Sequence, residues 1–118
     1  MTEQNREWAW AAGLYEGEGT VTKSKNGTTY TISMGMTDED VVRRFHQVIG
    51  CGKVYGPYQP KRQGSKPFWR WSVSDKKGTL RFAERVLGWL GQRRQTQLNP
   101  VLARARRIEG RCDSRFDN

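Results

Sequence analysis

Two glutamates near the N-terminus, Glu16 and Glu18, alternate with glycines and could place carboxylate oxygens at the end of a helix. The residues before them are apolar at helical spacing, and Gly17 and Gly19 are typical of a helix end. An anion at a helix C-terminus adds to the negative end of the macrodipole, which is unfavourable by about 0.3–1 kcal/mol. A divalent cation would reverse that sign, because it becomes the largest local charge. Glu18 and the carbonyl of Gly17 would then offer the oxygen ligands that Mg²⁺ prefers.

The two glutamates are not expected to share one role. Residues two apart on a helix point roughly 200° apart, so Glu16 and Glu18 reach one ion only if the helix has already ended. We therefore expect Glu18 to be the metal ligand and Glu16 to have a structural role, such as a bond across an interface. The alternative is that both are solvated residues at a helix end. The helix before them and the strand after them favour the metal-binding interpretation.

The helix that must position these carboxylates, residues 4–15, has apolar side chains on two faces. Trp8 and Tyr15 share one face, and Trp10 and Leu14 share another. Two apolar faces indicate burial on two sides, by the chain's own core and by a partner. The helix also carries small residues, which would let a second backbone approach closely. The residues expected at an interface with a partner helix are Trp8, Ala9, Ala12, Gly13 and Glu16.

The remaining sequence predicts an α+β domain with the element order αββαββαα over residues 1–109, followed by a polar tail at residues 110–118. The first hairpin turns at Asn26-Gly27, a strong hairpin signal. Thr37, with Asp40 three residues later, has the spacing of a capping box that begins the second helix. The expected strands are residues 20–25, 28–36, 53–58 and 67–74, and the later helices are residues 38–49, 79–90 and 98–108.

Alternating residues in these strands predict an antiparallel sheet with one apolar, covered face and one small, polar and basic face. Asp and Glu are scarce on all four strands, whereas a face that is merely solvated, the alternative, would normally mix both signs. A strand of about eight residues spans roughly 27 Å, which equals about eight base pairs of DNA. The side chains expected to contact DNA are Thr20, Thr22, Ser24, Asn26, Thr29, Thr31, Ser33, Lys53, Tyr55, Lys66, Arg70 and Ser72.

Composition agrees with a nucleic-acid partner without proving one. The 118 residues include 21 Lys and Arg against 12 Asp and Glu, a net charge of +9, and the pI is near 10.1. Such an excess favours phosphate binding, although ribosomal and membrane-surface proteins share it. Cys51 and Cys112 are too far apart to suggest a zinc site, and His46 lies in a predicted helix, which argues against a nucleophile–histidine pair. We expect an intracellular protein, because no signal peptide or membrane span is evident.

Residues 11–19, Ala-Ala-Gly-Leu-Tyr-Glu-Gly-Glu-Gly, resemble the signature of the LAGLIDADG homing endonucleases. Ala11 stands at the first Leu, Glu16 and Glu18 stand at the two Asp, and Gly19 closes the motif. The resemblance extends over about residues 7–108. It implies an αββαββα unit whose strands form a saddle over the major groove of double-stranded DNA. A chain with one motif resembles the homodimeric members, which cut a long pseudo-palindromic site.

Site roles follow from the same resemblance. It implies that Glu18 of each subunit, with the Gly17 carbonyl, holds Mg²⁺, or Mn²⁺ or Ca²⁺ at the same place. Asp38 would order solvent, and Arg94, with Arg93 as the reserve, would face the scissile phosphate. The chain departs from the family in having Glu at both acidic positions and in its short length. A non-cleaving DNA-binding protein, an RNA-splicing maturase on the same fold, and a basic protein of another family stay open as alternatives.

Overall fold

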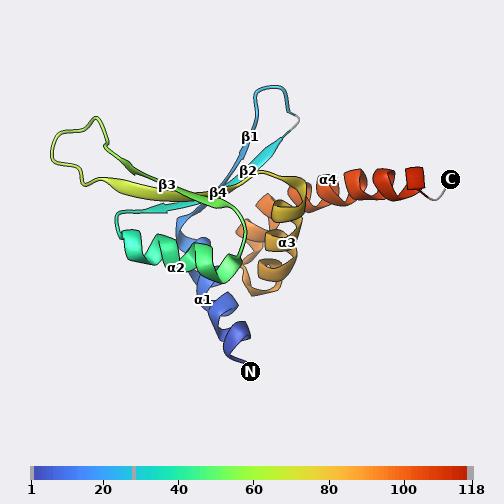
Figure 1. The fold of residues 1–118 in the computed structure, drawn as a ribbon, viewed down its shortest axis with the longest axis horizontal. Helices are drawn as coiled ribbons and strands as arrows, with labels where there is room; N and C mark the ends of the chain where they lie inside the picture. The colour runs from blue at the N-terminus through green and yellow to red at the C-terminus, as the bar shows by residue number, and fades with distance from the viewer. Residues whose placement is uncertain (1, 28, 117–118) are drawn as a thin grey trace.

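The computed structural model describes residues 2–27 and 29–116, with side chains through residue 106. Its elements follow the order expected from the sequence, with an added 3₁₀ turn, η1, before the last helix (Figure 1). The elements are α1 (Glu3–Glu18), β1 (Gly19–Lys23), β2 (Tyr30–Met36), α2 (Glu39–Ile49), β3 (Lys53–Tyr58), β4 (Phe68–Val73), α3 (Lys76–Val86), η1 (Leu87–Trp89) and α4 (Gln92–Phe116).

The four strands form one antiparallel sheet in the order β1-β2-β4-β3. In Figure 1 the β1–β2 and β3–β4 hairpins diverge above the helices, which gather on the other side of the sheet. The expected alternation is confirmed, since Ile32 of β2 is buried while its neighbour Ser33 faces the other way, into a groove. The predicted α+β class and four-stranded antiparallel sheet are therefore confirmed.

Aromatic rings fill the centre of the core between the sheet and the helices. Trp71 of β4 packs against Phe45 and Phe82, with ring centroids 4.9 Å and 5.1 Å away, and Phe82 also packs edge-on against Tyr15 of α1. The Trp71 Nε1–H donates to the Cys51 carbonyl at 2.8 Å, so its one polar group is satisfied. The core thus joins α1, α2 and α3 to the covered face of β4. Among the described residues, none of the helices has the length and apolar character needed to cross a membrane.

Helix α1 is longer than expected and passes straight into β1. It runs through Gly17 to Glu18, and Gly19 has ordinary extended backbone angles, φ −78° and ψ 158°. Gly19 is required for space instead, because a Cβ there would lie 2.4 Å from the Tyr15 ring and 2.6 Å from its carbonyl oxygen. The close packing of Tyr15 under this residue sets where the helix gives way to the strand.

Two other helices begin at different residues from those predicted. Helix α3 begins at Lys76, because the Asp75 side chain accepts the N–H of Gly78 and caps it. Helix α4 begins at Gln92, so Pro100 lies in its interior and not in its first turn, which makes the predicted start at residue 98 wrong. The helical backbone also continues to Phe116, through most of the expected tail, and residues 117–118 lie outside the described residues.

Tyr15 carries a polar atom that the core leaves unsatisfied. Its side chain is fully buried, and its hydroxyl has no hydrogen-bond partner among the described residues. Burial is the main reason that the pKa of Tyr15 is raised to about 12; nearby Glu16 adds to the rise, and Arg94 partly opposes it. A buried hydroxyl without a partner costs free energy that a phenyl ring would not.

Tyr15→Phe is therefore expected to leave the free energy of unfolding unchanged or raise it by about 1 kcal/mol, measured by urea denaturation at pH 7. The effect should grow with alkali. The pKa of Tyr15 in the folded protein lies above the ordinary value of 10, so the wild type loses stability as the pH rises from 10 towards 12. The phenylalanine variant has no ionisable hydroxyl and does not show this loss. A loss of more than 1 kcal/mol at pH 7 would contradict the assignment of an unsatisfied hydroxyl.

Candidate functional site

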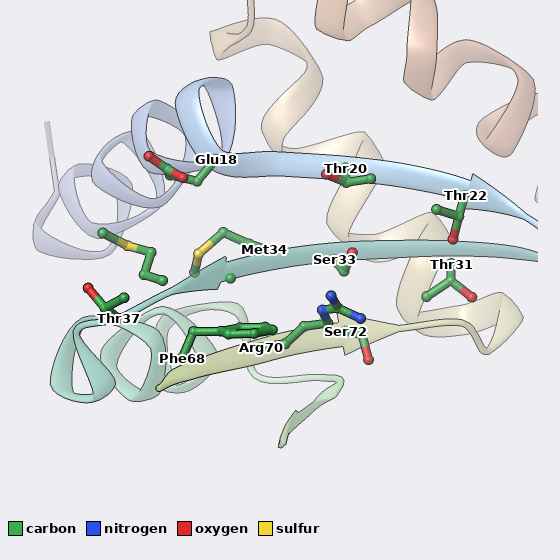
Figure 2. A pocket seen from close by; sticks show the side chains of 12 residues that line it. Glu18, Thr20, Thr22, Thr31, Ser33, Met34, Thr37, Phe68, Arg70 and Ser72 are labelled. Carbon is green, nitrogen blue, oxygen red and sulfur yellow. The ribbon is translucent and has the colours of Figure 1, made fainter. Parts of the chain in front are cut away.

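A groove of about 640 Å³ lies along the uncovered face of β1, β2 and β4 (Figure 2). Seven of the residues predicted to bind metal or DNA line it, and within the described part of the chain no acidic side chain except that of Glu18 does so. The lining residues are Glu18, Thr20, Thr22, Thr31, Ser33, Met34, Gly35, Met36, Thr37, Phe68, Arg70 and Ser72. The polar sheet face expected from alternation is thus a concave surface with hydroxyl groups and one guanidinium.

Strand register arranges the hydroxyl groups in rows across the sheet. Thr20 is opposite Ser33, Ser33 is opposite Ser72, and Ser72 is opposite Lys53, so one row crosses all four strands. A second row pairs Thr22 with Thr31. Hydroxyl groups both donate and accept, and they can hydrogen-bond several base edges. The rows offer such groups at regular intervals along the groove.

The predicted contacts at the tip of the first hairpin mainly build the turn. The Ser24 hydroxyl donates to Asn26 Oδ1 at 2.6 Å and accepts the backbone N–H of Thr29 at 3.1 Å. Gly27 adopts φ +71°, and its carbonyl accepts Nη1–H of Arg104 from α4 at 2.8 Å. Helix α4 therefore fixes where this hairpin projects. Lys66 is exposed in the connection between β3 and β4.

Glu18 lies at the last position of α1, exposed, beside the first residue of β1. Figure 2 shows its carboxylate at the end of the groove that also holds Thr37 and Phe68. In the described residues, no group of three or more His, Cys, Asp or Glu side chains is placed to hold a metal ion. One carboxylate and backbone carbonyls suit Mg²⁺ chemically, but further oxygens must come from outside the chain.

Asp38, predicted to order solvent, does not line the groove. It occupies the N-cap of α2, where its carbonyl accepts the N–H groups of Val41 and Val42. Its negative charge there is favoured by the helix macrodipole. Thr37, predicted as the cap, lines the groove instead. Asp38 and not Thr37 is therefore the N-cap residue, because α2 begins one residue later than the capping-box spacing indicates.

Arg94, predicted to face a phosphate, is buried with 7% exposure. Its Nε–H donates to the Glu16 carbonyl at 3.0 Å, and its Nη1–H donates to Gln97 Oε1 at 2.9 Å. The guanidinium also lies 5.7 Å from the ring centroid of Tyr15. In this structure the side chain braces the C-terminal turn of α1 and does not point into the groove. Its neighbour Arg93 is exposed.

Glu16 completes a reciprocal arrangement between the two helix ends. Its carboxylate approaches the backbone N–H of Gly91, at 3.4 Å, where α4 begins. The Glu16 anion thus lies at the N-terminus of α4, and the Arg94 cation lies at the C-terminus of α1. Each charge interacts favourably with the macrodipole of the helix whose end it contacts. Glu16 has the structural role expected of it, but the bond is within the chain and does not cross an interface.

The predicted interface residues on α1 divide into two groups. Trp8 and Ala12 are 3% and 0% exposed in the chain's own core, so they are not available to a partner, which corrects that part of the prediction. Gly13 is exposed, Ala9 is partly exposed, and a Cβ added at Gly13 would meet nothing within 4 Å. The surface of α1 that is free to contact a partner is therefore narrower than the two apolar faces suggested.

The family model for the LAGLIDADG-like domain matches residues 7–87 of this chain. The chain belongs to the LAGLIDADG family. Its motif is the C-terminal half of α1 together with the first residue of β1. Among curated proteins, none has a significantly similar sequence.

Solved structures share the LAGLIDADG fold seen here. The homing endonuclease I-CvuI, in complex with its target in the presence of Ca, superposes with a TM-score of 0.67 at 17% identity, over 93% of this chain and 72% of that one. The LAGLIDADG meganuclease I-AabMI, bound to uncleaved DNA, gives a TM-score of 0.66 at 10% identity, over 89% of this chain and 37% of that one. The archaeal intron-encoded I-Vdi141I, complexed with DNA, gives 0.57 at 11% identity, over 94% and 72%.

Sequence reasoning gave no site role to two aromatic residues at the side of the groove, Phe68 and Tyr58. Phe68 lines it, and the neighbouring Tyr58 is 41% exposed, with their ring centroids 5.3 Å apart. Regular alternation would place Tyr55 and Tyr58 on opposite faces of β3. A bulge between them changes this, and Gly56-Pro57 is the local signal that could have indicated it, since proline is found in sheets at edges and bulges.

Proposed function

We propose that this LAGLIDADG protein is a sequence-specific double-stranded DNA endonuclease that acts as a homodimer with a divalent metal ion. The observation that carries the proposal is the placement of Glu18, an exposed carboxylate at the helix–strand junction, at one end of a groove otherwise lined by neutral and cationic side chains. A protein that only bound DNA would gain nothing from a negative charge there. The homing endonuclease I-CvuI, which has this fold, is complexed with DNA in the presence of Ca and, with the DNA not cleaved, in the presence of Mg.

The donor set agrees with metal-assisted hydrolysis. Glu18 and the Gly17 carbonyl would hold the ion, and phosphate oxygens would supply further ligands. A bound divalent ion supplies charge stabilisation for the attacking and leaving oxygens of a phosphodiester. The chain's own contribution is to fix the carboxylate, through the Arg94 and Glu16 contacts that hold the end of α1, and to orient DNA along the hydroxyl rows.

A second copy of the chain would complete the site. Ala9, Gly13 and Gly17 recur every four residues on α1, and a Cβ at either glycine would meet nothing within 4 Å. Such a stripe allows two helices to approach closely. Two copies of α1 packed along it would bring two Glu18 carboxylates together, one for each strand of the duplex.

The experiment that tests the proposal uses a randomised duplex library, incubated with the protein in Mg²⁺ and in EDTA, with sequencing of all new ends. Discrete Mg²⁺-dependent double-strand cuts within a pseudo-palindrome are expected. Retention of a defined sequence without cutting would instead favour a binding-only relative or a maturase. The absence of both cutting and retention would contradict the proposal.

Variants of Arg94 and Arg93 distinguish a residue that positions α1 from a residue that contacts phosphate. Arg94→Met keeps the apolar stem but removes two hydrogen bonds, and it is expected to lower the free energy of unfolding by about 2–3 kcal/mol. Cleavage of the selected duplex should fall with it, because the end of α1 is released. The free energy of unfolding is measured by urea denaturation and cleavage by initial rates, on the same protein preparation.

Arg93→Met is the matched control, since that side chain is exposed and its loss should change stability by less than about 0.5 kcal/mol. A large loss of cleavage with unchanged stability in Arg93→Met would identify Arg93 as the phosphate contact. The same result in Arg94→Met would contradict the positioning role given to Arg94.

A further inference from the structure

The aromatic cluster, defined as Tyr55, Tyr58, Phe68 and Arg70, makes one part of the groove chemically unlike the rest. Phe68 and Arg70 belong to β4 and line the groove, and the two tyrosines of β3 lie opposite them. In Figure 2, Phe68 lies at the Glu18 end, whereas Thr22 and Thr31 lie towards the other end. The groove lining near the carboxylate therefore includes an aromatic ring, whereas Thr22 and Thr31 line the other end with hydroxyl groups.

The bulge in β3 assembles this cluster. Tyr55 pairs with Arg70 and Tyr58 pairs with Phe68, so between these pairs two residues of β3 lie opposite one residue of β4. Gly56, within the bulge, has φ +136°, a backbone conformation that residues other than glycine rarely adopt. A Cβ there would also lie 2.8 Å from the Trp69 ring and 3.0 Å from the Phe68 carbonyl. The extra residue brings both tyrosines to the face of Arg70.

Arg70 is held by rings and not by a carboxylate. Its guanidinium carbon lies 5.8 Å from the ring centroids of both Tyr58 and Phe68, within the range of cation–π attraction. The ion pairs of the described side chains join Arg43 with Glu39 and Arg106 with Glu84, and Arg70 has no part in them. The rings therefore restrain the position of the Arg70 guanidinium, and its N–H groups can still donate to a ligand that offers paired hydrogen-bond acceptors.

We propose that the aromatic cluster reads a guanine and a thymine in each half-site, Arg70 pairing with the guanine and Phe68 contacting the thymine methyl. This inference rests on the proposed function and specifies the substrate of the same groove. Arginine donates two hydrogen bonds to guanine O6 and N7, and an apolar ring suits the thymine C5-methyl group, which no other base carries. Threonine and serine in the remaining groove discriminate less, because a hydroxyl can pair with several bases.

Strand spacing sets the distance between the two bases. Phe68 and Arg70 are two residues apart on β4, about 6.8 Å along the strand. DNA rises about 3.4 Å per base pair, so a strand that follows the groove places the two contacts about two base pairs apart. Because Phe68 lies at the Glu18 end, the thymine is the base nearer to the cleavage position.

The first test is selection from a randomised duplex library by the wild type and by three variants. The wild type should enrich a thymine and a guanine about two base pairs apart in each half-site. Phe68→Ala should lose the thymine preference and keep the guanine, and Arg70→Ala should lose the guanine by about tenfold or more. Ser74→Ala is the matched control, because Ser74 is exposed just after β4 and does not line the groove, so this variant should keep both preferences.

The second test needs no protein variant, so a folding defect in Phe68→Ala cannot obscure it. Deoxyuridine replaces the selected thymine, which removes only the methyl group. Binding of the wild type, measured by fluorescence anisotropy, should weaken about fourfold, the effect of one buried methyl group. The same replacement at a thymine outside the inferred position should have no effect, and 5-methylcytosine in place of the thymine should retain part of the affinity.

Three outcomes overturn the inference. Enrichment of a defined site without this thymine–guanine pair would do so and leave the proposed endonuclease intact. Equal binding of thymine and deoxyuridine duplexes would exclude the methyl contact. Failure to retain any duplex would overturn both the inference and the proposed function.

Discussion

Glu18→Gln is expected to reduce Mg²⁺-dependent cleavage by at least about 100-fold, the loss that even the outer partners of metal ligands can cause. Glutamine keeps the shape of the side chain and one acceptor oxygen, but it removes the acidic group that, among the described residues, alone lines the groove. DNA binding should persist and can tighten, because an anion is removed from a surface that meets phosphates. The side chain is exposed, so the fold should not change.

Initial rates on the selected duplex and anisotropy in Ca²⁺ or EDTA measure the two effects separately. Glu18→Asp restores the acid at a length shorter by one methylene and should retain more cleavage than Glu18→Gln. Glu39→Gln is the matched control, since it makes the same charge change in an exposed ion pair on α2. Unchanged cleavage in Glu18→Gln would remove Glu18 from the site. Loss of binding without unfolding would show that it acts in some way other than through a metal.

Gly13→Gln is expected to convert the proposed dimer into a monomer and to abolish the proposed double-strand cleavage. A side chain at this position enters open space in the single chain, so it does not disturb the chain's own packing. Its helix propensity should even stabilise an isolated chain by up to about 1 kcal/mol relative to glycine. The same side chain would separate two α1 helices that must approach backbone to backbone.

Sedimentation equilibrium and the unfolding transition together test this prediction. Ala103→Gln is the control, because Ala103 is exposed on α4, away from the stripe on α1. A monomeric and stable Gly13→Gln with an unchanged Ala103→Gln would support the proposed interface. A dimer that tolerates glutamine at position 13 would contradict it and require another surface for association.

Local patterns predicted the elements well because their causes are local. The period-two alternation in residues 30–36 and 68–73 is a direct property of the pleat, and it correctly separated Ile32 and Trp71 from Ser33 and Arg70. The glycine-punctuated motif correctly placed Glu18 where the helix gives way to the strand. The predicted start of α4 at residue 98 is wrong, because the turns that begin at Gln92 contact a distant segment, as when Arg94 donates to the Glu16 carbonyl.

Long-range contacts decided what the site residues do. Arg94 lies in a basic run typical of an exposed surface, yet it is buried because the Glu16 carbonyl, 78 residues away in sequence, accepts its Nε–H. Trp8 and Ala12 were assigned to a partner because sequence cannot tell which of two apolar faces meets the chain's own core. A bulge in a neighbouring strand also brought Tyr58 beside Phe68.

The sequence by itself therefore determined the order of the elements, the two faces of the sheet and the position of the motif carboxylate. These depend on spacing of 2.0 or 3.6 residues along the chain, which is visible in the residues themselves. The tertiary structure alone decided which arginine is buried, which stripe of α1 remains exposed and which rings gather around Arg70. Such contacts join segments far apart in sequence, where packing and shape, and not local periodicity, select the neighbours.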